Sequence, residues 1–299
     1  MFKRTVAIFA IVFCALLLIG CAQKTNNDNE LYVIDCSNNI VGANIELNIW
    51  NQEYFESENA PKTYKITYNG TTFDGDYLYS VNRKCDSYIQ NIYNTDDGVQ
   101  FAIKDGTENI VYLNFQTKEF FNTEPYKEEV VNQQEYAIEL SKTIASDFIN
   151  IDDYIMSVGD PKVYSVEEDT NDSFSFYFVT FAREINGLST SDYITVKTTS
   201  KGTLASIILG DVGIFEEIKT INYSISELNQ RIDNKVKSFY KKLDYEVINN
   251  SIDRQIICMT QSGEICIYSS QKVIVHSNNV NEDINTGVVV LVYLEDEGQ

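Results

Sequence analysis

The sequence predicts an α+β fold: helix-plus-antiparallel-sheet units in tandem, preceded by a β-rich N-terminal region. Two segments, residues 130–148 and 225–243, repeat apolar residues at the spacing of one helix face. Most of the remaining chain alternates apolar and polar residues between Asn-Gly, Asp-Gly and Lys-Gly turn signals. Because a helix packed across one face of an antiparallel sheet covers such strands economically, each helix is expected to serve the strands that follow it.

The first 20 residues have the pattern of a secretion signal. Lys3 and Arg4 precede an apolar run of 15 residues, which is shorter than the roughly 20 residues of a spanning helix. The sequence Leu-Ile-Gly-Cys at residues 18–21 resembles the bacterial lipobox. This resemblance implies removal of residues 1–20, a diacylglyceryl group on Cys21, and a lipid-anchored, extracytoplasmic protein at the cell membrane. An uncleaved anchor helix and a leader cut without lipidation remain alternatives, and both also export the chain.

Charge limits the partners of the exported chain. Removal of residues 1–20 leaves 21 basic and 44 acidic residues, a net charge of −23. Nucleic-acid affinity depends on Lys and Arg side chains that neutralise phosphates, so nucleic acid is not expected as a partner. The same balance repels anionic lipid, and the membrane is therefore expected to be contacted through the lipid at Cys21. Residues 21–30 are polar and predict a flexible tether.

Residues 31–125 are predicted to form the β-rich domain, because they contain no helical repeat. The candidate strands are residues 31–36, 44–50, 63–68, 77–81, 98–104 and 109–115. Turns are predicted at Asn69-Gly70, Asp74-Gly75, Asp97-Gly98 and Asp105-Gly106.

Residues 126–215 are predicted to form the first helix-plus-sheet unit. One helix face is formed by four apolar residues: Ala137, Leu140, Ile144 and Phe148. Asn132 followed by Glu135 is a weaker helix-start signal. Strands predicted at 173–185, 192–199 and 203–210 would form a three-stranded meander.

Residues 216–299 are predicted to form the second unit. Ser224 and Glu227 make a capping box, and Tyr223 with Leu228 makes a hydrophobic staple, so a helix is expected over 225–243. Its apolar face would carry Ile225, Leu228, Ile232, Val236, Phe239 and Leu243. The predicted strands are 245–251, 254–261, 263–270 with 272–277, and 286–295.

Residues 178–209 carry a family resemblance. Their Arg-ending strand, Asn-Gly turn, Asp-led strand and Lys-Gly turn look like the strand portion of PepSY-like domains of secreted and lipid-anchored Gram-positive proteins. Residues 98–115 are similar in style. The resemblance covers about 85 residues, those of the first unit, and extends to the second unit by architecture alone. It implies helix-plus-sheet modules that bind peptides or restrain peptidases, and it brings no catalytic residues.

Export makes cysteine pairing possible. Cys36, Cys85, Cys258 and Cys266 allow three connectivities. A hairpin around residues 261–263 would place Cys258 opposite Cys266, at a non-hydrogen-bonded site within disulfide reach. Cys36 with Cys85 would then be the second bond, while buried thiols that act as small apolar groups remain the alternative.

The sequence contains no complete catalytic or metal-binding motif. His276 is the single histidine, and no Gly-x-Ser-x-Gly, His-Glu-x-x-His or phosphate-binding loop occurs. Asp169, Asn171 and Ser173 alternate like the start of a calcium loop, but the required Gly and Glu are missing. Four lysines in the last turns of the second predicted helix complement its dipole and are predicted to be a solvated face: Lys235, Lys237, Lys241 and Lys242. No catalytic residue, cofactor or metal is therefore expected.

The predicted function is non-catalytic binding of a peptide, protein or envelope component, with restraint of a peptidase as one form. An exposed sheet edge can recruit an extended peptide by strand addition. One alternative is a carboxylate-based hydrolase of cell-wall glycan or peptide, which would use a pair of Asp or Glu residues. With 44 acidic residues in the chain, close pairs occur by composition alone and carry little information. A second is a transporter-associated solute-binding protein, which would need more alternation of strands and helices than two helices allow.

Overall fold

The computed structural model describes residues 44–48, 52–83, 86–123, 133–165, 173–185, 187–218, 225–277, 279 and 281–293. The strands are β1 (Asn44–Asn48), β2 (Gln52–Phe55), β3 (Thr63–Tyr68), β4 (Thr71–Arg83), β5 (Gln90–Thr95), β6 (Gln100–Lys104), β7 (Ile110–Asn114), β8 (Ile155–Val158), β9 (Lys162–Ser165), β10 (Ser173–Ile185), β11 (Leu188–Thr199), β12 (Leu204–Leu209), β13 (Tyr245–Met259), β14 (Ile265–Ser277) and β15 (Glu282–Tyr293). The helices are α2 (Lys118–Thr123), α3 (Gln133–Ala145), the short 3-10 helix η3 (Ile151–Asp153) and α4 (Ile225–Lys242).

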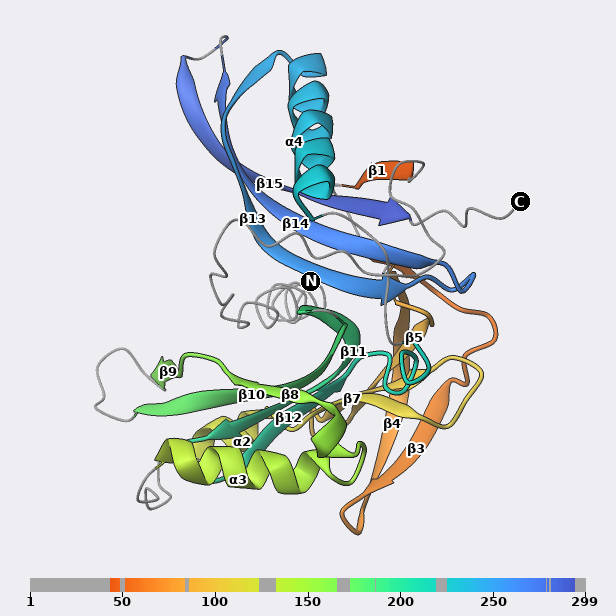
Figure 1. Cartoon of the computed structure of the whole chain (residues 1–299). Helices are drawn as coiled ribbons and strands as arrows, with labels where there is room; N and C mark the ends of the chain where they lie inside the picture. Colours follow the sequence, from red (N-terminus) through yellow and green to blue (C-terminus); the bar gives the residue numbers. More distant parts are fainter. Residues whose placement is uncertain are drawn as a thin grey trace.

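One mixed sheet connects all of these strands. Its order is β1-β15-β14-β13-β11-β12-β7-β6-β5-β4-β2, with β3 beside β4, and β8 and β9 beside β10. The parallel contact is a single residue pair, Thr190 with Ile257, between β11 and β13. Figure 1 shows the consequence: β13–β15 with α4 form one layer, and β10–β12 with α3 form a second layer that continues into β4–β7.

The predicted α+β fold of tandem helix-plus-sheet units is wrong. The described residues are mostly β, with 15 strands in one large mixed sheet and three α-helices. The physical reason lies in strand pairing across the predicted boundaries: β12 pairs with β7 through Ser206 and Asn114, and β11 pairs with β13. Periodicity identifies strands but not their partners. The predicted boundaries at 125/126 and 215/216 therefore fall within segments that share one sheet, and they stay a prediction.

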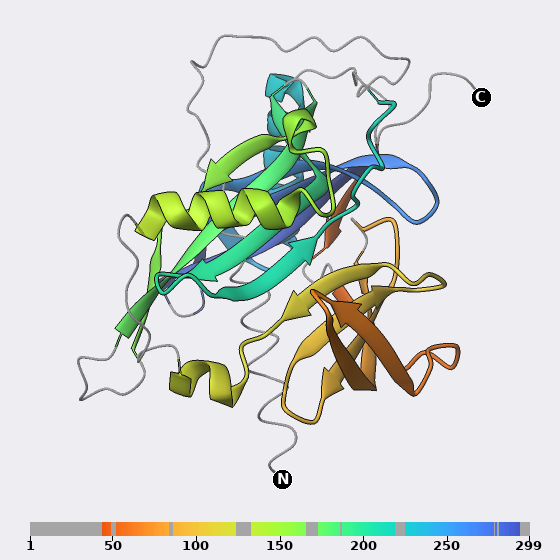
Figure 2. The same ribbon diagram turned by 90° about the horizontal axis from the view of Figure 1, so that it is seen from below.

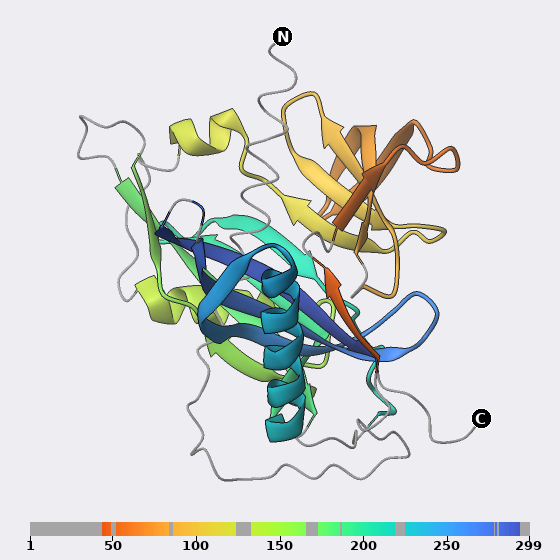
Figure 3. The same cartoon turned by 90° about the horizontal axis from the view of Figure 1, so that it is seen from above.

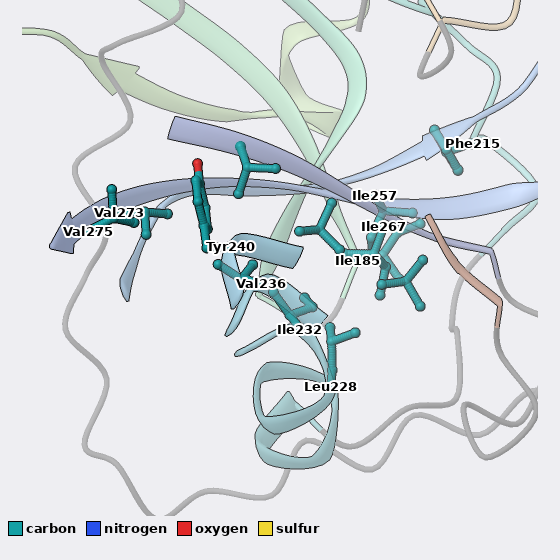
Figure 4. Close-up of a cluster of buried hydrophobic side chains, with 13 residues drawn as sticks. Ile185, Phe215, Leu228, Ile232, Val236, Tyr240, Ile257, Ile267, Val273 and Val275 are labelled. Atoms are coloured by element: carbon teal, nitrogen blue, oxygen red, sulfur yellow. The ribbon is translucent and has the colours of Figure 1, made fainter. Parts of the chain in front are cut away.

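The helix predicted over 225–243 is confirmed as α4. Its buried residues recur every four positions: Leu228, Ile232, Val236 and Tyr240. Figure 4 shows these side chains on the face of α4 that meets the valines and isoleucines of β13–β15, and Figure 3 shows the helix lying across those strands. Tyr240 takes the place expected of Leu243, which is 50% exposed because the helix ends before it. The predicted caps at Tyr223 and Ser224 lie outside the described residues.

α3 covers the opposite layer, as Figure 2 shows from below. Ile144 and Ala145 pack with Val179 and Phe181 of β10 and with neighbouring residues of β11 and β12. The meander predicted over 173–210 is confirmed, because β10 pairs antiparallel with β11 and β11 with β12. Asn132, the predicted cap, lies outside the described residues.

The N-terminal strands have a separate aromatic core. The rings of Tyr93 and Phe101 stack with centroids 5.3 Å apart, and both residues are fully buried. The turn predicted at Asp74-Gly75 is wrong, because both residues lie within β4. Gly75 instead permits this ring packing, because a Cβ there would meet Phe101 Cε1 at 2.7 Å. The strands predicted at 44–50, 63–68, 98–104 and 109–115 match β1, β3, β6 and β7, and the strand predicted at 77–81 is part of β4. α2, β2, β5, β8 and β9 were not predicted, and the strand predicted at 31–36 lies outside the described residues. Among the described residues, no helix is long and apolar enough to cross a membrane.

Candidate functional site

The most distinctive surface feature is the edge formed by β8 and β9. Both short strands pair with one side of β10, and among the described residues neither pairs with any other strand. Residues 159–161 between them add one residue relative to β10, because Val158 lies opposite Val179 and Lys162 lies opposite Phe176. The Gly159 N–H still donates to Phe178 O at 2.9 Å. The two strands therefore form one bulged edge, residues 155–165, called the β8–β9 edge below.

Large apolar side chains on the β8–β9 edge are exposed. Ile155 is 54% exposed, Met156 40% and Val163 71%. Directly opposed residues of an antiparallel pair lie on the same face of a sheet. Met156, opposite the buried Phe181, therefore extends the α3-side face, and Ile155, opposite Ala182, extends the other. An edge strand that is apolar on both faces resembles an incomplete sheet more than a solvated border.

Acidic residues flank the same edge. Asp152 and Asp153 lie in η3 immediately before β8, and Asp160 lies in the bulge; all three are exposed. Pro161, beside Asp160, has no N–H to offer to a neighbouring strand. The bulge thus interrupts the edge, and β8 presents four backbone positions next to a negatively charged end.

A buried ion pair supports the start of β8. Tyr154, the residue before β8, donates its hydroxyl to Asp192 Oδ1 at 2.6 Å, and Arg183 Nε donates to Asp192 Oδ2 at 3.0 Å. The Arg183 guanidinium also lies 4.8 Å from the Tyr154 ring centroid. Asp192 is fully buried, so this network satisfies a charge that would otherwise be costly. The network fixes Tyr154, and with it the entry of the chain into β8.

A buried lysine lies in the layer behind β9. Lys197 on β11 is 1% exposed; its Nζ donates to Gln116 Oε1 at 2.7 Å and lies 3.7 Å from the Phe176 ring centroid. Burial, helped by the positive charge of Lys162, lowers the pKa of Lys197 to about 7. The aromatic ring favours the ammonium form and acts in the opposite direction. A neutral amine is a nucleophile, but a side chain this deeply buried offers a substrate no direct approach.

The carboxylate that best tests the hydrolase alternative is Asp211, which is 5% exposed. Burial raises the pKa of Asp211 to about 6, against the opposing hydrogen bonds from Ser87. Ser87 donates its hydroxyl to Oδ1 at 2.5 Å and Ser191 donates to Oδ2 at 2.8 Å. A raised pKa suits a general acid, yet both oxygens are already bonded and covered. Asp211 therefore joins the 86–88 loop to β11 and does not face a substrate.

The predicted cysteine register is confirmed. Cys258 lies directly opposite Cys266 in the β13–β14 hairpin, both are fully buried, and their Sγ atoms are 3.3 Å apart. The predicted type of pair is wrong: Thr260 N–H donates to Glu264 O at 2.9 Å, and alternation makes Cys258 and Cys266 a hydrogen-bonded pair too. Cys21, Cys36 and Cys85 lie outside the described residues, so their predicted roles stay predictions.

The other polar residues singled out in the sequence do not form a site among the described residues. His276 Nδ1 lies 2.8 Å from Asp283 Oδ1 across β14 and β15, a partner that the local sequence did not reveal. The four lysines near the end of α4 are exposed, which confirms the predicted solvated face. Within the described ranges, no three His, Cys, Asp or Glu residues gather as metal ligands. Asp169 and Asn171 of the calcium-like pattern lie outside those ranges.

Sequence reasoning missed the residues of the β8–β9 edge. Residues 154–158, Tyr-Ile-Met-Ser-Val, form a short apolar run followed by Gly159 and Pro161. A short β-branched and apolar run that stops at Gly and Pro is a strand signal, and a Pro within such a run indicates an edge. That signal was available in the sequence.

Comparison with known proteins adds little. No family model matches the chain, and no curated protein matches it. Among solved structures, an uncharacterised protein from Eubacterium rectale is similar over 79% of this chain and 74% of that chain, at 12% identity and a TM-score of 0.36. A likeness at this level does not establish a shared fold or function.

Proposed function

We propose that this protein is a lipid-anchored, extracytoplasmic, non-catalytic binding protein that adds an extended segment of an envelope partner to its β8–β9 edge. The observation that carries the proposal is the exposure of Ile155, Met156 and Val163 on an edge that pairs on one side among the described residues. Strand addition takes its affinity from main-chain hydrogen bonds and its specificity from alternate side chains.

The side chains of the edge define the ligand. Met156 and Val163 extend one face and Ile155 the other, so a segment with apolar residues at alternate positions would continue these faces. Asp152, Asp153 and Asp160 favour Lys or Arg at the remaining positions. A peptidase segment is one such partner, as the resemblance of residues 178–209 to PepSY-like strands would imply.

The test uses the soluble fragment 30–299 and labelled peptides of about ten residues that alternate Val with Lys or Thr, matched to the span of β8 and β9. Two further peptides carry N-methyl groups on alternate residues, in one or the other phase. Only one phase blocks the hydrogen bonds to the edge, and we expect that peptide to bind at least about tenfold more weakly in fluorescence anisotropy. Equal weakening by both phases would contradict strand addition.

Matched variants locate the site. Ile155→Lys with Val163→Lys should weaken binding of the unmodified peptide at least about tenfold by removing apolar contacts and repelling its lysines. Thr63→Lys with Thr67→Lys places the same charges on exposed positions of β3 and should leave binding unchanged. Equal loss in both variants would reject the assignment to β8–β9. Cleavage of the peptide would favour the hydrolase alternative instead.

The anchor has its own test. Two acyl chains give lasting attachment where one is marginal, and the acidic composition offers no competing attraction to anionic lipid. Mass spectrometry of the mature protein should find a diacylglyceryl cysteine at Cys21 as the first residue. Cys21→Ala should release the protein from the membrane fraction, and an unmodified mature N-terminus elsewhere would reject the anchor.

A further inference from the structure

The β13–β14 hairpin brings two buried sulfur atoms together at its closed end. Gly263 in the loop has φ +84, and its N–H donates to Thr260 O at 2.9 Å, which closes a tight turn. This turn sets the register that places Cys258 directly opposite Cys266. The separation of their sulfur atoms, 3.3 Å, is longer than the S–S bond of about 2.05 Å.

The backbone at this position suits a disulfide. Hydrogen-bonded cross-strand pairs have Cα atoms about 5.5 Å apart, which lies within the range that disulfides span. The sulfur atoms therefore need to approach by little more than 1 Å, roughly the reach of small χ1 changes, without a shift of strand register. Their described neighbours on this face include Ile256, Tyr268 and Leu291, which belong with both cysteines to one buried apolar cluster.

We infer that Cys258 and Cys266 form a sealed structural disulfide that closes this hairpin in the exported protein. The oxidant is a disulfide-bonded thiol compound or protein of the extracytoplasmic space. One cysteine thiolate attacks the external S–S bond, forming a mixed disulfide and releasing one thiolate. The second cysteine attacks the mixed disulfide and releases the other thiolate. Two S–H groups are lost, their protons pass to the released thiolates, and the oxidant is reduced to two thiols.

Burial fixes when this exchange happens. Both cysteines are fully buried in the folded chain, so an external disulfide reaches them only before the sheet closes or after it opens. The same burial protects the finished bond from reductants. The bond would hold the hairpin loop in place, where Gln261 Nε2 donates to Asn82 Oδ1 of β4 at 2.7 Å and links the C-terminal hairpin to the N-terminal strands.

Peptide mapping of the exported, unaltered protein tests the pairing. Cleavage after Arg254 and Lys272 leaves both cysteines in one peptide, so a cut after Glu264, which lies between them, is also needed. Without reductant, the two resulting peptides should remain joined and separate only after reduction. Alkylated Cys258 and Cys266 in the unreduced protein, or a bond from either to Cys36 or Cys85, would overturn the inference.

Reduction of the folded protein tests whether burial protects the bond from reductants. Folded protein in a thiol reductant should keep the bond, and loss should follow the rate of unfolding measured under the same conditions. The Cys258→Ala and Cys266→Ala double variant should melt about 5 °C lower than the oxidised protein and about as low as the reduced protein. Rapid reduction of the folded chain, faster than it unfolds, would reject the sealed bond, and unchanged melting on reduction would show that no bond had formed.

Discussion

The β2–β3 and β8–β9 edges are built alike and differ in what they expose. Each consists of two short strands along one side of a strand of 13 residues, β4 for the first and β10 for the second. The exposed residues of β3 are Thr63, Lys65 and Thr67, and Ile66 between Lys65 and Thr67 is buried. β2 exposes Glu53 and one aromatic side chain, Tyr54, which is 43% exposed. The exposed residues of β8 and β9 include two aliphatic side chains and one methionine.

The difference shows that backbone arrangement alone does not decide whether an edge attracts another strand. A charged or polar edge discourages further pairing, whereas an apolar one favours it. β3 alternates strictly, so every apolar residue finds the core. β8 has consecutive exposed apolar residues, Ile155 and Met156, and the bulge with Pro161 limits how far a new strand could extend.

The layers behind the two edges also differ, in the kind of side chain that is buried there. Tyr64 and Tyr77 around Tyr93 and Phe101 form an aromatic cluster behind β3. The Arg183–Asp192 ion pair and Lys197 lie behind β8 and β9 instead. Buried charges make the second region sensitive to pH and to single substitutions, whereas the first depends on ring packing.

The largest expected effect comes from removing the ion pair behind β8. Arg183→Ala leaves the buried Asp192 carboxylate without its cation and should lower the free energy of unfolding by about 3 kcal/mol. Hydrogen exchange of the β8 amides should rise most, because Tyr154 loses the arrangement that holds it. Urea unfolding and exchange measure the two effects.

The matched substitution on the other edge is Lys65→Ala, which removes the ion pair with Asp74 at 2.9 Å. Both side chains are largely exposed, and exposed pairs contribute little. We expect no measurable change in stability or in exchange of β3. A loss equal to that of Arg183→Ala would show that the two regions do not differ in the way described.

The second effect is a pH dependence due to Lys197. The pKa of Lys197 is about 7 in the folded chain, below the ordinary lysine value of 10.5 that the unfolded chain retains. The unfolded chain therefore binds more protons between these values, and this group makes stability rise with pH from about 7 to about 10. We expect this rise in the free energy of unfolding to be about 3 kcal/mol, less than the full pKa shift would give, because the Phe176 ring stabilises the ammonium form. Lys197→Met should remove it. Unfolding curves at several pH values measure it, and an unchanged slope would contradict it.

The most direct comparison of the two edges comes from making β3 resemble β8. Thr63→Val, Lys65→Ile and Thr67→Val change exposed side chains, and stability should stay within about 0.5 kcal/mol. The altered edge should instead increase self-association with concentration in sedimentation velocity, relative to the unaltered chain. Unchanged sedimentation would mean that exposed apolar side chains do not decide the behaviour of these edges.

Local patterns predicted the elements well wherever one segment contains all the information. The repeat of Leu228, Ile232 and Val236 predicts α4 because a helix face is a property of neighbouring turns. The turn at Gly263 and the alternation on both sides of it predict that Cys258 faces Cys266, because a tight hairpin fixes its own register. β3 and β10 match their predicted ranges for the same reason.

The sequence by itself therefore determined helices α3 and α4, most strands, the acidic charge and the hairpin that pairs the two cysteines. The tertiary structure decided the rest: one mixed sheet in place of tandem units, the single parallel contact of Thr190 with Ile257, and the burial of Lys197. It also decided that β8 and β9 line an edge. Pairing and burial between segments far apart in the chain are set by global packing and loop closure, and alternation along a strand is the same whichever neighbour the strand acquires.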